Sequence, residues 1–154
     1  TYTQSRAGDN IAIDSDTTVF VINPSQSISA IQAPGNDQNI VIKVTYQRVS
    51  YLLTGDAESS AEARMISMYN CSAYVLKVGH HGSSSASSAA FLKAIIPHIA
   101  VISVGANNTY GHPAPQTLAR LAAVNATVYR TDTQGTIIVT TNGQTVDVRA
   151  TRNT

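Results

Sequence analysis

Three apolar runs in this chain each end at a glycine that is followed by an acidic or imidazole side chain. Parallel strands of an open α/β sheet bring their carboxyl ends to one edge, and such sheets hold their chemistry there. The pattern therefore predicts an α/β fold with aspartate and histidine gathered at that edge. The three junctions are Leu53-Thr54-Gly55-Asp56, Val78-Gly79-His80-His81-Gly82, and Val104-Gly105 with its loop to Gly111-His112-Pro113.

Aspartate and histidine in one cluster suit a hard-to-borderline divalent metal. A glycine after a strand is often only a turn, and a histidine there is often only a solvated loop residue. Three such junctions in consecutive β-to-α connections favour a functional site over that simpler interpretation. His98, which follows Pro97 at an expected helix end, is expected to be exposed.

The length of the chain predicts one domain over residues 1–154, and apolar periodicity predicts an α/β layered fold with a mixed sheet and helices on one face. Ala61, Met65, Met68 and Tyr69 form the apolar stripe of one helix, and Phe91, Leu92, Ile95 and Ile96 that of the next. Asn142-Gly143 predicts a closing hairpin. The expected helices are 57–69, 87–96 and 115–123; the expected strands are 11–13, 18–22, 39–46, 49–54, 75–78, 99–104, 128–129, 136–141 and 145–149.

Several of these strands are apolar at nearly every position. Ile40, Val41, Ile42 and Val44 form one run, and residues 99–102 and 137–139 form two more. Strands that read this way are typically buried on both faces. A second apolar face is therefore expected, and with it a homo-oligomer or another partner that covers the face.

The composition limits the possible surfaces and compartments. Charged residues make up 12% of the chain, against roughly 25% in an average soluble protein, and the net charge of +1 excludes a strongly basic nucleic-acid surface. Cys71 is the only cysteine, so no intramolecular disulfide forms, and it is expected to be buried. The profile favours an extracellular or cell-surface location. Because the chain starts at Thr1, we expect it to be excised from something longer.

Four motifs in one order make a specific pattern that covers most of residues 8–141. Together they resemble the carboxyl-terminal half of the metallo-β-lactamase-fold domain of the ComEC-type DNA-internalisation competence protein family. The motifs are Leu52-Leu53-Thr54-Gly55-Asp56-Ala57-Glu58, Leu76-Lys77-Val78-Gly79-His80-His81-Gly82-Ser83, Ile102-Ser103-Val104-Gly105 with Asn108 and Tyr110-Gly111-His112-Pro113, and Tyr129-Arg130-Thr131-Asp132 with Gly135.

The resemblance implies an αββα sandwich hydrolase that holds one or two zinc or manganese ions. It implies that Asp56 bridges the metals and that His80 is a ligand, with His81 as the alternative ligand or as a proton donor. Strand alternation would send the two imidazoles to opposite sides, so only one is expected to ligate directly. His112 either serves catalysis beside the substrate or merely caps the next helix.

Ser83, Asn108 and Tyr110 are the further candidates for substrate contact, and Asp132 is expected to form a turn. The implied activity is metal-assisted hydrolysis of a phosphodiester, with single-stranded DNA as the substrate during uptake.

The main metal motif of that fold, His-x-His-x-Asp-His, is not in this chain. The expected partner is therefore the missing amino-terminal half, the fragment alone is expected to show little or no activity, and any membrane contact would come only through the parent protein. Two alternatives remain open. One is a stand-alone secreted hydrolase similar to phosphorylcholine esterases, and the other is a non-catalytic scaffold half.

Overall fold

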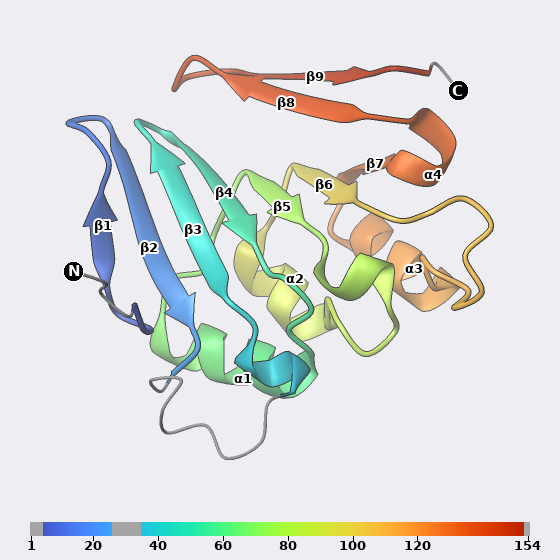
Figure 1. The fold of residues 1–154 in the computed structure, drawn as a ribbon, viewed down its shortest axis with the longest axis horizontal. Coiled ribbons are helices and arrows are strands. Elements are labelled where there is room, and N and C mark those ends of the chain that lie inside the picture. The colour runs from blue at the N-terminus through green and yellow to red at the C-terminus, as the bar shows by residue number, and fades with distance from the viewer. Residues whose placement is uncertain (1–4, 26–34, 153–154) are drawn as a thin grey trace.

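The computed structural model describes residues 5–25 and 35–152 of the chain (Figure 1). The strands are β1 Asn10–Ala12, β2 Thr17–Asn23, β3 Val41–Tyr46, β4 Val49–Leu53, β5 Val75–Lys77, β6 Ile99–Ile102, β7 Thr127–Arg130, β8 Ile137–Thr141 and β9 Val146–Ala150. The helices are α1 Ser59–Met68, α2 Ala89–Ile95, α3 Pro115–Ala123 and α4 Thr131–Gln134, with short 3-10 turns η2 Asn36–Gln38 and η3 Gly79–Gly82.

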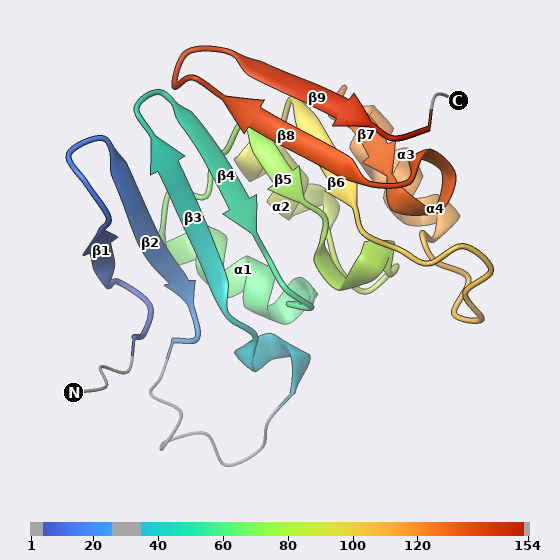
Figure 2. The same cartoon turned by 45° about the horizontal axis from the view of Figure 1, so that its top comes forward.

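Seven strands form one mixed sheet in the order β1 to β7. The pairs from β1 to β4 are antiparallel, and the pairs from β4 to β7 are parallel. Helices α1, α2 and α3 lie on one face of this sheet (Figures 1 and 2). The predicted α/β class, the mixed sheet and the placement of the helices are confirmed.

The register of the strands separates the two faces of the sheet. Leu52, Leu76 and Ala100 are aligned on neighbouring strands, are fully buried, and belong to the core beneath the helices. The adjacent row on the other face, which we call the second face, runs across six strands. Its members are Val21, Ile42, Leu53, Lys77, Val101 and Tyr129.

The second face is apolar apart from Lys77, as expected, but it is incompletely covered. Leu53 is 39% exposed, and Ile42, Val101 and Tyr129 are partly buried. The prediction that this run is buried on both faces is most clearly wrong at Ile40, which lies just before β3 and is 66% exposed. Within the described residues, the helices cover only one face of the sheet.

The final hairpin forms as predicted, but as a separate two-stranded sheet of β8 and β9. Figure 2 shows it on the side of the seven-stranded sheet opposite the helices. Its turn meets the β3–β4 turn, where Arg48 N–H donates to Gly143 O at 3.1 Å. Ile138 on the hairpin is 50% exposed, so the predicted two-sided burial of residues 137–139 is wrong.

The two helix-stripe predictions are also wrong at one position each, Met68 and Ile96. Met68 is 61% exposed because it lies in the last turn of α1, and Ile96 is 64% exposed because α2 ends there in a left-handed residue, φ 53°. Cys71 is buried and His98 is exposed, as predicted. Within the described ranges, no helix is long and apolar enough to cross a bilayer.

Candidate active site

Asp56 leaves the carboxyl end of β4 on a turn that is fixed to the neighbouring strand. The buried hydroxyl of Thr54 donates to Lys77 O at 2.8 Å, and the His80 N–H donates to Gly55 O at 3.0 Å. The turn that carries Asp56 and the turn that carries the histidine pair are therefore joined by direct hydrogen bonds.

His80 and His81 lie on η3, beyond the end of β5, with both backbones in the left-handed region. Their φ angles are 47° and 53°. A non-glycine residue held there costs on the order of 1–3 kcal/mol, and such residues cluster at functional sites. The alternation argument does not apply, because the pair is not on a strand. The rings nevertheless diverge, with centroids 6.4 Å apart and an interplanar angle of 67°.

Glycine at position 82 is required by the approach of another segment. Gly82 has φ +84°, and a Cβ atom there would lie 2.6 Å from Cβ of Pro113. The Ala114 N–H also donates to Gly82 O at 2.9 Å. The histidine turn is thereby held against the residues that follow His112, at the start of α3.

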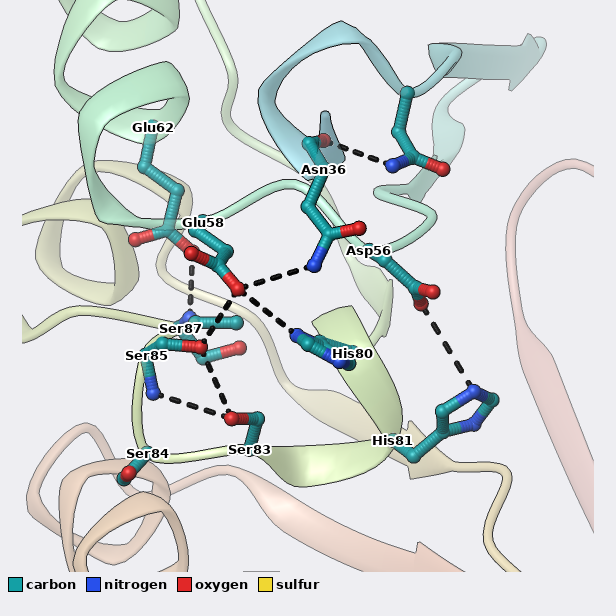
Figure 3. Close-up of polar contacts among 12 residues, drawn as sticks. Asn36, Asp56, Glu58, Glu62, His80, His81, Ser83, Ser84, Ser85 and Ser87 are labelled. Carbon is teal, nitrogen blue, oxygen red and sulfur yellow. Dashed lines mark hydrogen bonds and ion pairs between the residues drawn. The ribbon is translucent and has the colours of Figure 1, made fainter. Parts of the chain in front are cut away.

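His81 is the histidine that approaches Asp56. Its Nδ1 lies 2.8 Å from Ser103 O, and because a carbonyl only accepts, Nδ1 carries the proton in the neutral ring and Nε2 then keeps its lone pair. Nε2 lies 3.9 Å from Asp56 Oδ1 (Figure 3). A carbonyl on the far nitrogen of a histidine is the usual second-shell partner of a metal ligand.

His80 faces a different carboxylate. Its Nδ1 is buried, makes no hydrogen bond of regular geometry within the described residues, and lies 3.2 Å from Glu58 Oε1 (Figure 3). Within the same residues, no ion pair within 4 Å joins His80 to Asp56. The two neighbouring imidazoles are thus paired with two different acids.

Glu58 is held by more than the imidazole. Asn36 Nδ2 and Ser85 Oγ each donate to Glu58 Oε1 at 3.1 Å. The hydrogen bond from Asn36 is the largest of the effects that lower the pKa of Glu58, and those from Ser85 and the charge of His80 act in the same direction. Glu58 occupies the N-cap position of α1, but its side chain does not cap the helix.

His112, Tyr110 and His81 line a pocket of about 190 Å³ together with Val104, Gly105 and Asn108. The ring centroid of His112 lies 5.9 Å from that of His80 and 5.9 Å from that of Tyr110, on which it stacks at 23°. Tyr110 is 81% exposed. The side chain of Asn108 is used within the loop, since Nδ2 donates to Gly105 O and His112 O, and Oδ1 accepts from His112 N–H.

The loop 83–88 behind the histidines is bound from two helices. The buried carboxylate of Glu62, on α1, accepts from Ser87 N–H at 2.5 Å and from Ser88 N–H at 2.8 Å. On α3, Arg120 Nη2 donates to the carbonyls of residues 84 and 86. The buried Ser83 belongs to this loop, and its hydroxyl lies 3.0 Å from Ser85 Oγ.

Burial shifts the titration of three groups around the site. It raises the pKa of Glu62, although the bonds from Ser88 and Ser87 and the charge of Arg120 oppose the shift. It lowers the pKa of His112, and positive charge on His80 and His81 lowers it further. It also lowers the pKa of Lys77, against the attraction of Asp56.

Asp56 and His81 fit one part of a metal coordination sphere. Zinc bonds to carboxylate oxygen and imidazole nitrogen are about 2.1 Å long, so two donors bound to one ion lie at most about 4.2 Å apart. The separation of 3.9 Å between these two atoms meets that limit. In the described part of the chain, no three His, Cys, Asp or Glu side chains form a group that could hold an ion. Further ligands would have to come from elsewhere.

The structure brings Asp56, His80, His81 and His112 to the carboxyl edge of β4, β5 and β6, while Ser83 and Asn108 bond to neighbouring loop atoms. The roles predicted for these residues stay predictions. Sequence reasoning missed Glu58 and Glu62 as site residues, since Glu58 was noted only as part of a motif and no pattern singled out Glu62. The signal that could have found Glu58 is its position two residues after Asp56, at the same edge.

Comparison with known proteins places the chain beside competence proteins. It is 35% identical over 133 residues to ComE operon protein 3 of Bacillus subtilis, 36% identical over 104 residues to competence protein ComA of Neisseria gonorrhoeae, and 36% identical over 107 residues to recombination protein 2 of Haemophilus influenzae. These matches cover 86%, 66% and 68% of the chain. No protein-family model matches it.

The chain spans only 17%, 15% and 13% of the lengths of these three proteins. The similarity therefore supports a relationship to one segment of competence-related proteins.

Proposed function

We propose that this chain supplies one half of a metal-dependent phosphodiesterase site that cleaves single-stranded DNA during uptake in competence. The observation that carries the proposal is the approach of Asp56 Oδ1 to His81 Nε2, in a chain similar to a segment of competence proteins. The names of these relatives support the role in DNA uptake. The hydrolytic chemistry rests on the donor pair and on the resemblance to the metallo-β-lactamase fold.

In this proposal Asp56 and His81 hold a divalent ion, zinc or manganese, so that His81 takes the ligand role first predicted for His80. The reason is geometric, because His81 has its Nδ1 bound to a carbonyl and its Nε2 directed at Asp56. A divalent metal there would polarise a phosphoryl oxygen and activate water. His80 and His112 then lie beside the reacting group, where an imidazole can transfer a proton to the leaving oxygen.

Tyr110 is placed to contact the substrate at the rim of the pocket. Its exposed ring offers a stacking surface to an unpaired base, and such stacking is tolerant of sequence. This contact suits a chain with a net charge of only +1, which has little general attraction for the DNA backbone.

We assign the second face to the missing amino-terminal half of an αββα sandwich. The row Val21, Ile42, Leu53, Val101 and Tyr129 is apolar and incompletely covered, and the chain spans a minor share of each relative. In this proposal the rest of the protein completes the ligand set and supplies any membrane contact, and the assembly works outside the cell or at its surface.

Light scattering tests the assignment of this face. The isolated chain should associate through the second face, with another copy or with the partner half. A stable monomer of 16.3 kDa at high concentration, with no binding of a hydrophobic dye, contradicts it.

The activity test uses the full-length protein that contains this chain, with manganese or zinc and single-stranded DNA. Asp56→Ala should abolish cleavage and leave the fold intact, whereas Asp147→Ala on the exposed hairpin strand β9 should leave the rate unchanged. An unchanged rate in Asp56→Ala removes Asp56 from the mechanism. Hydrolysis of a phosphorylcholine ester but not of DNA favours the secreted-esterase alternative, and no activity with either favours a scaffold.

A further inference from the structure

The contact between Glu58 and His80 has no part in the proposed metal pair. We propose that Glu58 is a positioning residue, which holds the His80 imidazole in the tautomer with its proton on Nδ1 and leaves the lone pair of Nε2 on the side away from Glu58.

The carboxylate of Glu58 is fixed independently of the imidazole. Asn36 approaches its Oε1 from η2, and Ser85 approaches it from the loop after η3, each at 3.1 Å. His80 Nδ1 is the third group at this oxygen, at 3.2 Å. Figure 3 shows the three contacts converging on one carboxylate oxygen. The oxygen is therefore in place whether or not the ring is there.

The chemistry of the contact selects one tautomer. A neutral imidazole donates from one nitrogen and accepts at the other, and the partner of one nitrogen decides which carries the proton. A carboxylate only accepts, so Nδ1 beside Glu58 must donate. Because Nδ1 is buried and has no regular hydrogen bond elsewhere in the described residues, no competing donor would reverse this assignment.

The same tautomer arises at His81 by a different route, since its Nδ1 donates to Ser103 O. Two adjacent imidazoles then carry their protons on Nδ1 and keep their lone pairs on Nε2. This second part of the inference rests on the proposed function, in which such lone pairs serve a metal ion or a substrate proton. The tautomer of His80 does not depend on it.

Long-range ¹H–¹⁵N NMR, recorded at a pH at which the ring ¹⁵N shifts themselves show neutral imidazoles, measures the tautomers directly. In the wild-type chain, His80 and His81 should both carry the proton on Nδ1. Glu58→Ala should move the His80 proton to Nε2, the form that histidine prefers in water, and leave His81 unchanged. Glu58→Asp serves as the second variant if the alanine variant fails to fold. It keeps the negative charge, but its side chain is too short to reach Nδ1, so it should also move the His80 proton to Nε2.

Asn36→Ala is the matched control, because it removes a different hydrogen bond of the same carboxylate. If Glu58 merely tethers η2 to the loop, both variants should act alike. The proposal requires that Asn36→Ala keep the wild-type tautomer. It is overturned if His80 carries its proton on Nε2 in the wild type, or if the Glu58 variants leave the tautomer unchanged.

A titration with zinc ions alone separates this inference from the proposed function. Loss of a second-shell partner weakens metal binding roughly 10- to 100-fold, so Glu58→Ala should weaken it if His80 serves the ion. If Glu58→Ala changes the tautomer of His80 but neither the wild type nor this variant binds zinc, the result supports the positioning role and counts against the metal site.

Discussion

The two edges of the parallel strands are both hollowed but differ in their chemistry. At the carboxyl edge, a pocket of about 190 Å³ is lined by His81 and His112 and lies beside Asp56. At the amino edge, a larger pocket of about 260 Å³ is lined by Tyr74 and His98, whose rings stack with centroids 4.4 Å apart. Among the described residues, no acidic side chain lines either pocket, but the carboxylates of Asp56 and Glu58 lie beside the histidines of the carboxyl edge.

The comparison shows that the volume of a pocket does not identify the site here. What distinguishes the carboxyl edge is that His80 and His81 each lie beside a carboxylate and that the amino termini of α1, α2 and α3 follow β4, β5 and β6 there. Helix amino termini favour negative charge, which suits a phosphate substrate. His98 stacks on Tyr74 and forms no ion pair with a carboxylate among the described residues, so we expect it to have no part in the chemistry.

The largest expected effect separates the two edges by activity. His81→Asn removes the imidazole and keeps a residue that tolerates left-handed backbone. In the full-length protein it should reduce DNA cleavage by more than the roughly 10- to 100-fold typical of a second-shell partner. His98→Asn should leave the cleavage rate at the wild-type value. Equal losses in the two variants would break the comparison.

The next effect concerns the approach of the histidine turn to Pro113. Gly82→Ala should lower the free energy of unfolding by roughly 2–4 kcal/mol, because the new methyl group meets Pro113 and the backbone is left-handed. Gly111→Ala is the control, since φ there is +71° but no atom lies within 4 Å of the added Cβ. It should cost about 1 kcal/mol, measured by the same denaturant titration.

Glu62→Gln tests the loop that supports the carboxyl edge. In the wild type, each carboxylate oxygen of Glu62 accepts a hydrogen bond from one backbone N–H, of Ser87 or of Ser88. Glutamine replaces one oxygen with an NH₂ group, which cannot accept, so one buried N–H loses its partner. The free energy of unfolding at neutral pH should therefore fall by roughly 1–3 kcal/mol. Because burial raises the pKa of Glu62 above its ordinary 4.5, the folded state binds more protons between the two values.

The stability of the wild type should therefore contain a component that is present below pH 4.5 and is lost as pH rises through the folded pKa. The glutamine variant should lack this decline, and denaturation over a range of pH measures it. If the wild type and Glu62→Gln show the same dependence of stability on pH, the pKa of Glu62 is not raised by burial and the prediction is wrong.

The smallest effect concerns Asp132, at the carboxyl end of β7. Arg130 binds it through two nitrogens, and the resulting hydrogen bond lowers the pKa of Asp132 below 3.8. The pair therefore stabilises the fold above pH 3.8, and this contribution is lost as pH falls through the folded pKa. Asp132→Asn should cost about 1 kcal/mol at neutral pH, while Asp147→Asn on the exposed β9 should cost nothing measurable.

The sequence predicted the order of strands and helices well because apolar periodicity and turn residues act locally. Pro115–Ala123 has the predicted bounds, and β3 and β4 fall within the predicted strands 39–46 and 49–54. The carboxyl edge could be predicted because three glycine-bounded junctions follow parallel strands. The side of the sheet taken by β8 and β9 could not be predicted, since it depends on the packing of the whole chain.

Inside the site, the sequence was informative about residue types and uninformative about pairing. Alternation along a strand gave no guide to His80 and His81, because both adopt left-handed backbone beyond the strand end. Glu58 and Glu62 look alike at the start of one helix, yet one contacts an imidazole and the other binds two backbone amides. The positions of Asn36, His80 and the loop 83–88 distinguish them, and tertiary contacts set those positions.

The attachment of the loop 83–88 to two helices has a consequence for motion. The loop contains no strand or α-helix, but Glu62 binds its amides from one side and Arg120 binds its carbonyls from the other. To release the Ser87 amide to solvent, α1 must separate from the loop, which is a sub-global opening and not a local fluctuation. We therefore expect the amides beside the histidine turn to exchange slowly, and those of the Tyr110 loop, whose Asn108 side chain bonds within the loop, to exchange faster.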